Sequence, residues 1–562
     1  MDPLPLSAER PKVEPWTRAI RKLIGQFISP KTLAYHARHE LLKELAGHLT
    51  KETFIYKNSS QRVTGCTCLL DCAAYLLEHV DGAILKDRPL YFQCIIFILR
   101  RREFDVNTFE IDYAGTMNLR CSSSVLRVMG RFRDFLFIVQ DYVVTKLSGK
   151  GLYPSLNSFC IAAVALNFFY VGAITSRLIN ALWSEEDDAN SEQHQEVAAT
   201  IDQLVEEMQD VASTKTDQGK TQAPSRSVQV FCSIKYAMTE IPLSPEFQAL
   251  AERVTQGEWI SRFRDEKPRQ YKLLAEIVSH ADYLTHGATD WCLVPGYFQM
   301  LHPVLIGMTE EAPAFTRRSV TLSKILLANM RLLNVFMRIA FTSTNVHDSM
   351  TTVGTIALVG EWFAVCRDRH DIMHLPDYID YDLLFKALEI LLDVEHFSVL
   401  ISTLSFLYDY LLLLPLNKRG EFLKTHLLST RMFYKLFLHW NAEVRLIFTH
   451  IIVYKVFCFE VVGQSIDGAA VSGRSRTRRT RVNDEEHVSL VEMRLANMHE
   501  QLEGTKKRVY PAHLEAYTTR ALAGYSAVLD EYYAWKKRMP IVKKTGAIVY
   551  PSITFANRLG GD

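Results

Sequence analysis

Several features that would identify a familiar class of protein are scarce in this sequence or missing from it. The 562 residues carry 64 Lys and Arg against 63 Asp and Glu, and this balance excludes a chain-wide cationic surface for nucleic acid. Ten cysteines are spread thinly, mostly inside apolar runs, which is typical of buried free thiols rather than of a disulfide framework. The first residues contain no apolar run of the secretory type, so we expect a cytoplasmic protein.

The motifs of several large enzyme classes are also missing. There is no P-loop, no glycine-rich dinucleotide fingerprint and no nucleophile elbow. The charged run Arg367–Asp371 lacks the glycine-rich loop, the paired lysine and the metal-binding aspartate that phosphoryl transfer needs, and we interpret it as a polar helix terminus. We therefore expect no catalytic residues, no cofactor and no enzyme activity. An enzyme whose polar residues converge only in three dimensions is the third hypothesis.

Two clusters have residue types that bind metals, but neither has the spacing of a metal site. His36, His39 and Glu40 share one helical turn, whereas the zinc-protease pattern has histidines four residues apart with a glutamate between them. Cys66, Cys68 and Cys72 do not form the paired C-x2-C arrangement of a four-ligand zinc site. We expect a solvated helix face and buried thiols, with no metal site.

The hydrophobic pattern predicts an all-α protein. Hydrophobic residues make up 48% of the chain and charged residues 23%, a globular composition. Apolar residues recur at helical spacing in many segments joined by short connections, which predicts a multi-helical, solenoid-like stack of helical hairpins with disordered insertions. No fixed repeat period emerges. Residues 541–555 are the one strand-like piece, and no strands alternate with helices.

Shifts in composition divide the chain into six predicted regions. They are a flexible leader (1–15), an N-terminal helical region (16–183), an acidic and polar insertion with one amphipathic helix (184–227), a main helical domain (228–460), a disordered Arg-rich insertion (461–487), and C-terminal helices with a tail (488–562).

One apolar segment is long enough to cross a membrane. No charged residue occurs between Gly151 and Ser176, and a span needs about 20 apolar residues. The buried central helix of a large helical protein has the same composition, and Asn157 and Asn167 interrupt the apolar run. We expect one buried helix over 155–182 and keep a span over 156–175 as the alternative.

The second insertion carries the sharpest local charge feature of the sequence. Arginines alternate there with hydroxyl residues: Arg474, Ser475, Arg476, Thr477, Arg478, Arg479, Thr480 and Arg481. One interpretation is a solvated loop that keeps the insertion soluble. The functional alternatives are binding of anionic lipid or nucleic acid, a nuclear import signal, and a phosphorylation switch that removes local positive charge.

A stretch near the end of the main helical domain carries a family resemblance. It reads HFSVLISTLSFLYDY from His396, MFYKLFLHWNAEVR from Met432 and FTHIIVYKVF from Phe448. These residues resemble a fungal family catalogued as domain of unknown function 1765, some of whose members are labelled membrane proteins. The resemblance extends over residues 120–460 and implies a fungal source and a helical domain. It implies no activity and no catalytic residues.

Within this stretch, His439, Trp440, Asn441 and Arg445 form a candidate structural corner between two helices. Asn441 is a good N-cap for the second helix. We expect His439 and Arg445 to satisfy backbone carbonyls or a nearby carboxylate such as Glu443 or Asp409. The alternative is that the corner forms a peptide-binding groove.

These observations predict a non-catalytic helical scaffold or adaptor that mediates protein–protein interactions in a fungal cell, with signalling as one setting. The alternative is a membrane-associated protein, anchored by residues 156–175 or by the Arg-rich loop on anionic lipid. The expected partners are other proteins, with an anionic membrane surface as the second choice and nucleic acid disfavoured. The expected location is the cytoplasm, including the cell cortex or a membrane surface.

Overall fold

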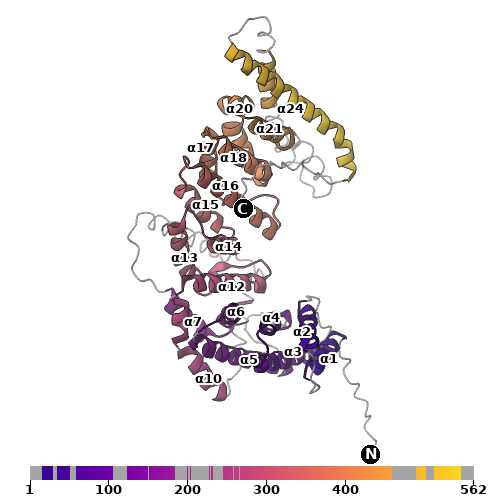
Figure 1. The fold of residues 1–562 in the computed structure, drawn as a ribbon, viewed down its shortest axis with the longest axis vertical. Coiled ribbons are helices and arrows are strands. Elements are labelled where there is room, and N and C mark those ends of the chain that lie inside the picture. Colours follow the sequence, from indigo (N-terminus) through magenta and orange to yellow (C-terminus); the bar gives the residue numbers. More distant parts are fainter. Residues whose placement is uncertain are drawn as a thin grey trace, which may run out of the picture. The chain divides into compact units, whose positions relative to one another are not determined.

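The computed structural model of the chain describes residues 15–28, 35–50, 59–104, 123–149, 151–183, 245–256, 258–264, 266–457, 489–500 and 512–545, with six isolated positions between 199 and 234. These residues form helices and connecting turns (Figure 1), and no strand occurs among them. The predicted all-α class is therefore confirmed, while a solenoid-like regularity stays a prediction. The predicted insertion that contains Arg474–Arg481 lies outside the described residues.

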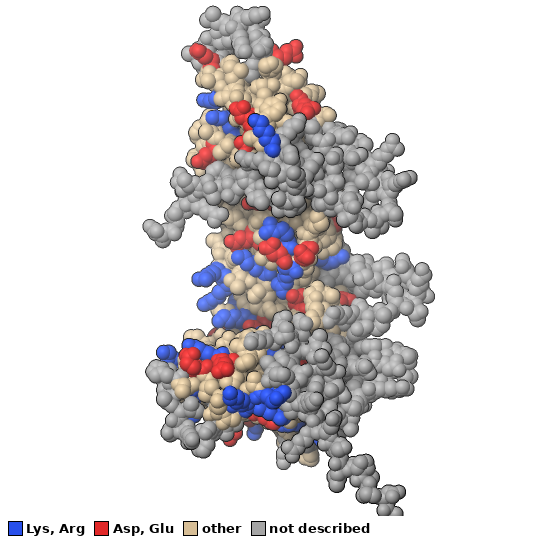
Figure 2. Space-filling model, turned by 90° about the vertical axis from the view of Figure 1, so that its right-hand side faces the viewer, with Lys and Arg blue, Asp and Glu red and all other residues tan. Residues whose placement is uncertain are grey.

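The chain forms two compact units, Met1–Gly307 (unit 1) and Met308–Asp562 (unit 2). The division falls inside helix α13 (Tyr297–Glu311) and inside the region 228–460, which the sequence predicts to be one domain. The six regions predicted from composition stay predictions. In the view of Figure 2, cationic and anionic side chains are interspersed over the described surface, in keeping with the balanced charge of the sequence.

Unit 1 is built around one helix that is apolar on every side, α6. Tyr153 is extended and Pro154 occupies the first helical position, where its missing N–H costs no hydrogen bond. Twelve of the 17 residues of α6 are buried, because α4, α5, α7 and α12 all pack against it. The helices of unit 1 are α1 (Pro15–Ile28), α2 (Tyr35–Leu49), α3 (Ser59–His79), α4 (Arg88–Leu99), α5 (Ser123–Ser148), α6 (Pro154–Tyr170), α7 (Gly172–Leu182), α10 (Pro245–Gln256), α11 (Ser261–Arg264) and α12 (Lys267–Thr285).

The prediction of one continuous helix over 155–182 is wrong. Segments Pro154–Tyr170 and Ile174–Leu182 are bent by 117° relative to each other. Val171 leaves the helical conformation at the break, with φ −123° and ψ 89°, just before Gly172. The hydroxyl of Thr175 donates to the carbonyl of Phe168, in the last turn of α6, while the Val171 carbonyl accepts from the backbone N–H groups of Ile174 and Thr175.

Two helical segments of the described chain satisfy the length and composition of a membrane span. One is the single helix α16 (Ser349–His370), of which 44% of the apolar window is buried, and the other is the bent pair α6 and α7. Core helices satisfy the same criteria. Membrane association therefore stays a prediction.

Five helices in the described part of unit 2 have a side-chain cap at their N-terminus. The side chains of Thr316, Asp348, Asp380, Ser429 and Asn441 accept hydrogen bonds from backbone N–H groups in the first turns of α14, α16, α17, α20 and α21. The helices of unit 2 are α14 (Arg317–Leu326), α15 (Leu332–Ser343), α16, α17 (Tyr381–Asp393), α18 (Phe397–Tyr410), α19 (Leu416–Phe422), α20 (Thr430–Phe437), α21 (Ala442–His450) and α24 (Ala512–Thr545), with π-helical segments η6 (Leu423–Leu427) and η7 (Ile451–Phe457).

The structure of unit 2 tests two interpretations that were made from the sequence. The charged run Arg367–Asp371 is the end of α16, as expected, with Asp371 in the left-handed conformation (φ 47°). Its cations lie near the negative end of the helix dipole, and Arg369 donates to the Ile325 carbonyl at 3.1 Å. The strand-like interpretation of 541–555 is wrong for its described part, because residues 541–545 continue α24; the rest lies outside the described residues.

Gly296 provides a test of packing in unit 1. Its φ is +62°, and a Cβ at this position would lie 2.4 Å from Cδ1 of Ile179 in α7. We expect Gly296→Ala to lower the unfolding free energy of unit 1 by about 1–3 kcal/mol through strain and overpacking. Hydrogen exchange of the α7 amides measures this loss. Gly47, inside α2, has no atom within 4 Å of its Cβ position, so Gly47→Ala is the control and should stabilise α2 by ~1 kcal/mol. Equal effects of the two changes would contradict the prediction.

Candidate functional site

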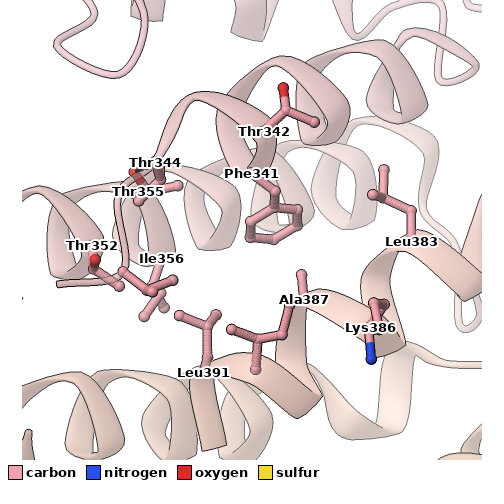
Figure 3. Close-up of a pocket in the computed structure, with 12 residues that line it drawn as sticks. Phe341, Thr342, Thr344, Thr352, Thr355, Ile356, Leu383, Lys386, Ala387 and Leu391 are labelled. Carbon is pink, nitrogen blue, oxygen red and sulfur yellow. Dashed lines mark hydrogen bonds between the residues drawn. The ribbon is translucent and has the colours of Figure 1, made fainter. Parts of the chain in front are cut away.

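A pocket of about 160 Å³ opens at the surface of unit 2 between α15, α16 and α17 (Figure 3). Phe341 and Ile356 face Ala387 and Leu391 across it. Ile356 and Leu391 are buried, and Ile390 at the rim is 42% exposed, so the pocket has an apolar floor and an open mouth. The pocket therefore offers hydrocarbon contacts to a group that enters from solvent.

The polar atoms that line this pocket already have partners within the protein. The hydroxyls of Thr344 and Thr355 lie 2.8 Å apart, and Thr352 donates to the Asp348 carbonyl at 2.8 Å. Lys386 is the one charged residue of the lining, and its Nζ lies 3.0 Å from Glu389. Because these groups are satisfied, an apolar group can enter without leaving a lining hydroxyl unpaired.

The volume of the pocket indicates what it can hold. A cavity of ~150 Å³ lined by apolar side chains holds one benzene molecule. At about 160 Å³, this pocket accommodates one aromatic or branched aliphatic group. Ordinary ligand pockets are larger, at about 300–1,000 Å³.

The four residues of the predicted corner lie together between α20 and α21. Asn441 Oδ1 accepts from the backbone N–H of Glu443 at 2.8 Å and of Val444 at 3.3 Å, so it is the N-cap of α21. Arg445 Nη1 donates to the carbonyls of His439, at 2.5 Å, and Trp440, at 2.9 Å. From the sequence we expect either backbone carbonyls or a carboxylate as the acceptor for Arg445, and the structure shows carbonyls.

The remaining two corner residues differ in exposure. His439 is buried, and its Nδ1 accepts from the backbone N–H of Asn441 at 3.1 Å. Burial lowers the pKa of His439, and the charges of Lys435, Arg445 and Arg520 lower it further, so the ring stays neutral at pH 7. Trp440 is 59% exposed, and its ring meets that of Phe397 edge to face at 5.7 Å.

The histidine cluster and the cysteine cluster that were considered as metal sites make other contacts in the part of the chain that the structure describes. His39 Nδ1 lies 2.7 Å from the buried carboxylate of Asp87, which ties α2 to the start of α4. Cys66, Cys68 and Cys72 are buried, as expected, and the Cys66 thiol donates to the Glu103 carbonyl at 3.6 Å. The side chain of His36 is not described. Within the described ranges, no three His, Cys, Asp or Glu side chains come close enough to hold a metal ion.

His280 is the titratable residue whose environment in unit 1 is most unusual. It is buried on α12 among the rings of Phe169, Tyr170 and Tyr283, and neither ring nitrogen has a hydrogen-bond partner. Burial lowers its pKa to about 3, and the charge of Arg100 contributes. A shifted histidine is a signature of some active sites, but aromatic rings surround this one, and no nucleophile or carboxylate bonds to it.

Comparison with known families identifies the region that contains the pocket and the corner. Residues 333–456 match the family model described as Protein of unknown function (DUF1765). The resemblance to this family is therefore confirmed for this region, which is shorter than the predicted 120–460. The DUF1765 region begins in α15 and ends in η7, so it includes every residue of both features. No curated protein and no solved structure matches the chain.

The pocket was not predicted, because its lining comes from three helices separated in the sequence. One signal could have indicated it. Ile390 and Ala387 lie beside the core stripe of α17, which is formed by Leu384, Leu388 and Leu391. An apolar stripe wider than one buried face can indicate a second packing surface.

His280 makes the stability of unit 1 depend on pH. The unfolded chain takes up a proton on this residue near pH 6.5, whereas the folded unit keeps it neutral down to about pH 3, so the unfolding free energy falls as the pH drops from 6.5 toward 3. We expect a loss of about 1–2 kcal/mol between pH 7 and pH 5, measured by urea unfolding or by hydrogen exchange of α12. His280→Phe should remove this part of the pH dependence. An equal loss in both proteins would rule out the assignment.

The N-cap at Asn441 can be tested in the same way. Asn441→Ala leaves the first N–H groups of α21 without a side-chain acceptor, so the unfolding free energy of unit 2 should fall by about 1 kcal/mol. Asn441→Asp is the matched control and should retain nearly all the stability, because aspartate caps equally well. Urea unfolding of the two variants gives the comparison, and equal losses would show that the cap is not the stabilising feature.

Proposed function

We propose that this chain is a non-catalytic helical scaffold or adaptor that mediates protein–protein interactions in the cytoplasm, in a fungal cell as the family resemblance implies, with signalling as one setting. The observation that supports it is the apolar pocket in the DUF1765 region, whose volume of about 160 Å³ suits one apolar side chain of a partner. Protein interfaces gain most of their binding energy from a few such side chains seated in desolvated pockets.

The surroundings of the pocket suit a protein partner. Ile390, which lines the pocket, is 42% exposed, so the apolar lining reaches the surface where a partner would bind. The lining offers one titratable side chain, Lys386, and acid–base or nucleophilic catalysis ordinarily needs a set of such groups.

The second proposal is a membrane-associated protein. The apolar helices α16 and α6 with α7 are the features that favour it, together with the Arg-rich run 474–481, which lies outside the described residues. We rank this proposal below the scaffold because α6 is already enclosed by four neighbouring helices. Entering a bilayer would require α6 to give up this packing.

Filling the pocket tests the scaffold proposal. Ala387 is half-buried in the lining, so Ala387→Met should occupy the empty space while preserving helix propensity and stability. We expect the affinity for pocket-dependent partners to fall at least about tenfold. Proximity labelling in cells of the source organism, compared across variants, reads out the change as a loss of specific neighbours.

Ala357→Met is the matched control, because Ala357 is exposed on α16 and does not line the pocket. The control should keep the neighbours of the wild type. If Ala387→Met keeps them as well, the pocket does not bind a partner. Carbonate extraction of the same cells separates the second proposal, because a carbonate-resistant pool indicates an inserted helix and a pool released by salt indicates an electrostatic surface contact.

A further inference from the structure

Exposed aromatic side chains and two arginines lie on α18, on the corner and on α24 in unit 2, where α21 packs against both α18 and α24. Figure 1 shows these helices. We call Phe397, Trp440, Arg445, Arg520 and Tyr517 the aromatic–arginine strip. Phe397 meets Trp440 at 5.7 Å, Arg445 donates to the Trp440 carbonyl, and Arg520 lies 5.4 Å from the centroid of the Tyr517 ring. Trp440 is 59% exposed, Tyr517 53% and Phe397 38%, so the strip faces solvent.

The two arginines of the strip lack carboxylate partners. Among the described side chains, no Asp or Glu forms an ion pair with Arg445 or Arg520, whereas Arg338, Arg367 and Arg431 of the same unit each pair with an aspartate. Asp393 already pairs with Arg431 and Lys435.

The two arginines lie on helices that pack against each other, α21 and α24. Burial lowers the pKa of Arg445, and the charge of Arg520 lowers it further. Two neighbouring positive charges repel, and an anionic group placed between them would relieve the repulsion. A carboxylate is the natural occupant, since the planar guanidinium fork binds it with two parallel hydrogen bonds.

The composition of the strip favours a protein over a membrane as its binding partner. An anionic membrane attracts each nearby Lys or Arg by about 1 kcal/mol, and surface attachment usually relies on clusters of 4–8 such residues, so two arginines supply too little. Trp, Tyr and Arg are instead the residues that dominate protein–protein hot spots. Their rings supply apolar contact while the arginines supply charge specificity.

We infer that the aromatic–arginine strip docks an acidic peptide segment of a partner protein. Its carboxylates bind Arg445 and Arg520, and its apolar side chains pack on Trp440, Phe397 and Tyr517. This inference names the partner's chemistry for the proposed scaffold function and so rests on it. The strip shares no residue with the pocket between α15, α16 and α17, so the two surfaces can be tested separately.

The test is selection of a randomised peptide library, displayed on phage, against the full-length chain. The library is first depleted on the double variant Trp440→Ala with Arg520→Glu, so that binders to other surfaces are removed. We expect enriched sequences to combine Asp or Glu with aromatic or aliphatic residues. The affinity of an enriched peptide is then measured against single variants of the full-length chain by fluorescence anisotropy.

The variants spare Arg445, because this residue also holds the corner through two carbonyls. Arg520→Glu and Trp440→Ala should each weaken the peptide at least about tenfold. The matched controls lie on α24 itself: Lys537→Glu makes the same change of charge at an exposed site, and Tyr533→Ala removes an aromatic ring that is 55% exposed. Both controls should retain wild-type affinity. Circular dichroism confirms that each variant is folded.

Several outcomes would overturn the inference. They are a selection that enriches nothing, one that enriches neutral or basic sequences, and a peptide that binds Arg520→Glu as tightly as the wild type. Binding of phosphatidylserine vesicles that depends on Trp440, without any enriched peptide, would replace the protein partner with a membrane. Ala387→Met should leave peptide binding unchanged. The proposal for the strip can therefore be wrong while pocket-dependent neighbours persist in cells. The proposal for the pocket can likewise be wrong while the strip still binds peptide.

Discussion

A helix that is apolar on every side must be enclosed on every side, and this constraint organises unit 1. In unit 1, α4, α5, α7 and α12 surround α6. In unit 2, α16, α17 and α21 pack around α18, which is apolar over most of its length. Polar groups inside these cores need local partners: Asn167 of α6 donates to Gln140 at 2.7 Å, and Trp362 of α16 donates to Ser323 at 2.8 Å. The side chains that these packed helices leave uncovered form the surface of unit 2.

The pocket and the corner belong to one connected set of helices. Lys435 of α20 donates to the carbonyls of Leu392 and Asp393 at the end of α17, at 3.0 and 2.7 Å, and Arg431 pairs with the Asp393 carboxylate. Because α17 forms one wall of the pocket and α20 leads into the corner, these bonds join the two features. The region that matches DUF1765 thus contains the apolar pocket and three of the five residues of the aromatic–arginine strip.

Local features of the structure could be read from the sequence because their causes are local. The helical periodicity of 121–147 is α5, the cap at Asn441 bonds to residues two and three positions later, and the charged run at 367–371 ends α16. The break between α6 and α7 was missed, because composition does not reveal that Val171 leaves the helical conformation or that Thr175 bonds back to the carbonyl of Phe168. The strand-like interpretation failed over 541–545, because β-branched residues are tolerated in a helix, as α24 shows.

The sequence by itself determined the all-α class, the burial of Cys66, Cys68 and Cys72 and the role of Asn441, since each depends on residues a few positions apart or on apolar periodicity. Only the tertiary structure decided where Phe341, Ile356 and Ala387 meet, because they come from three helices whose spacing depends on how all the core side chains pack. It also decided that Trp440 lies in solvent beside Arg445 and that α24, which carries Arg520, packs against α21, which carries Arg445. Periodicity states which face of a helix is apolar, whereas packing decides which part of that face its neighbours leave uncovered.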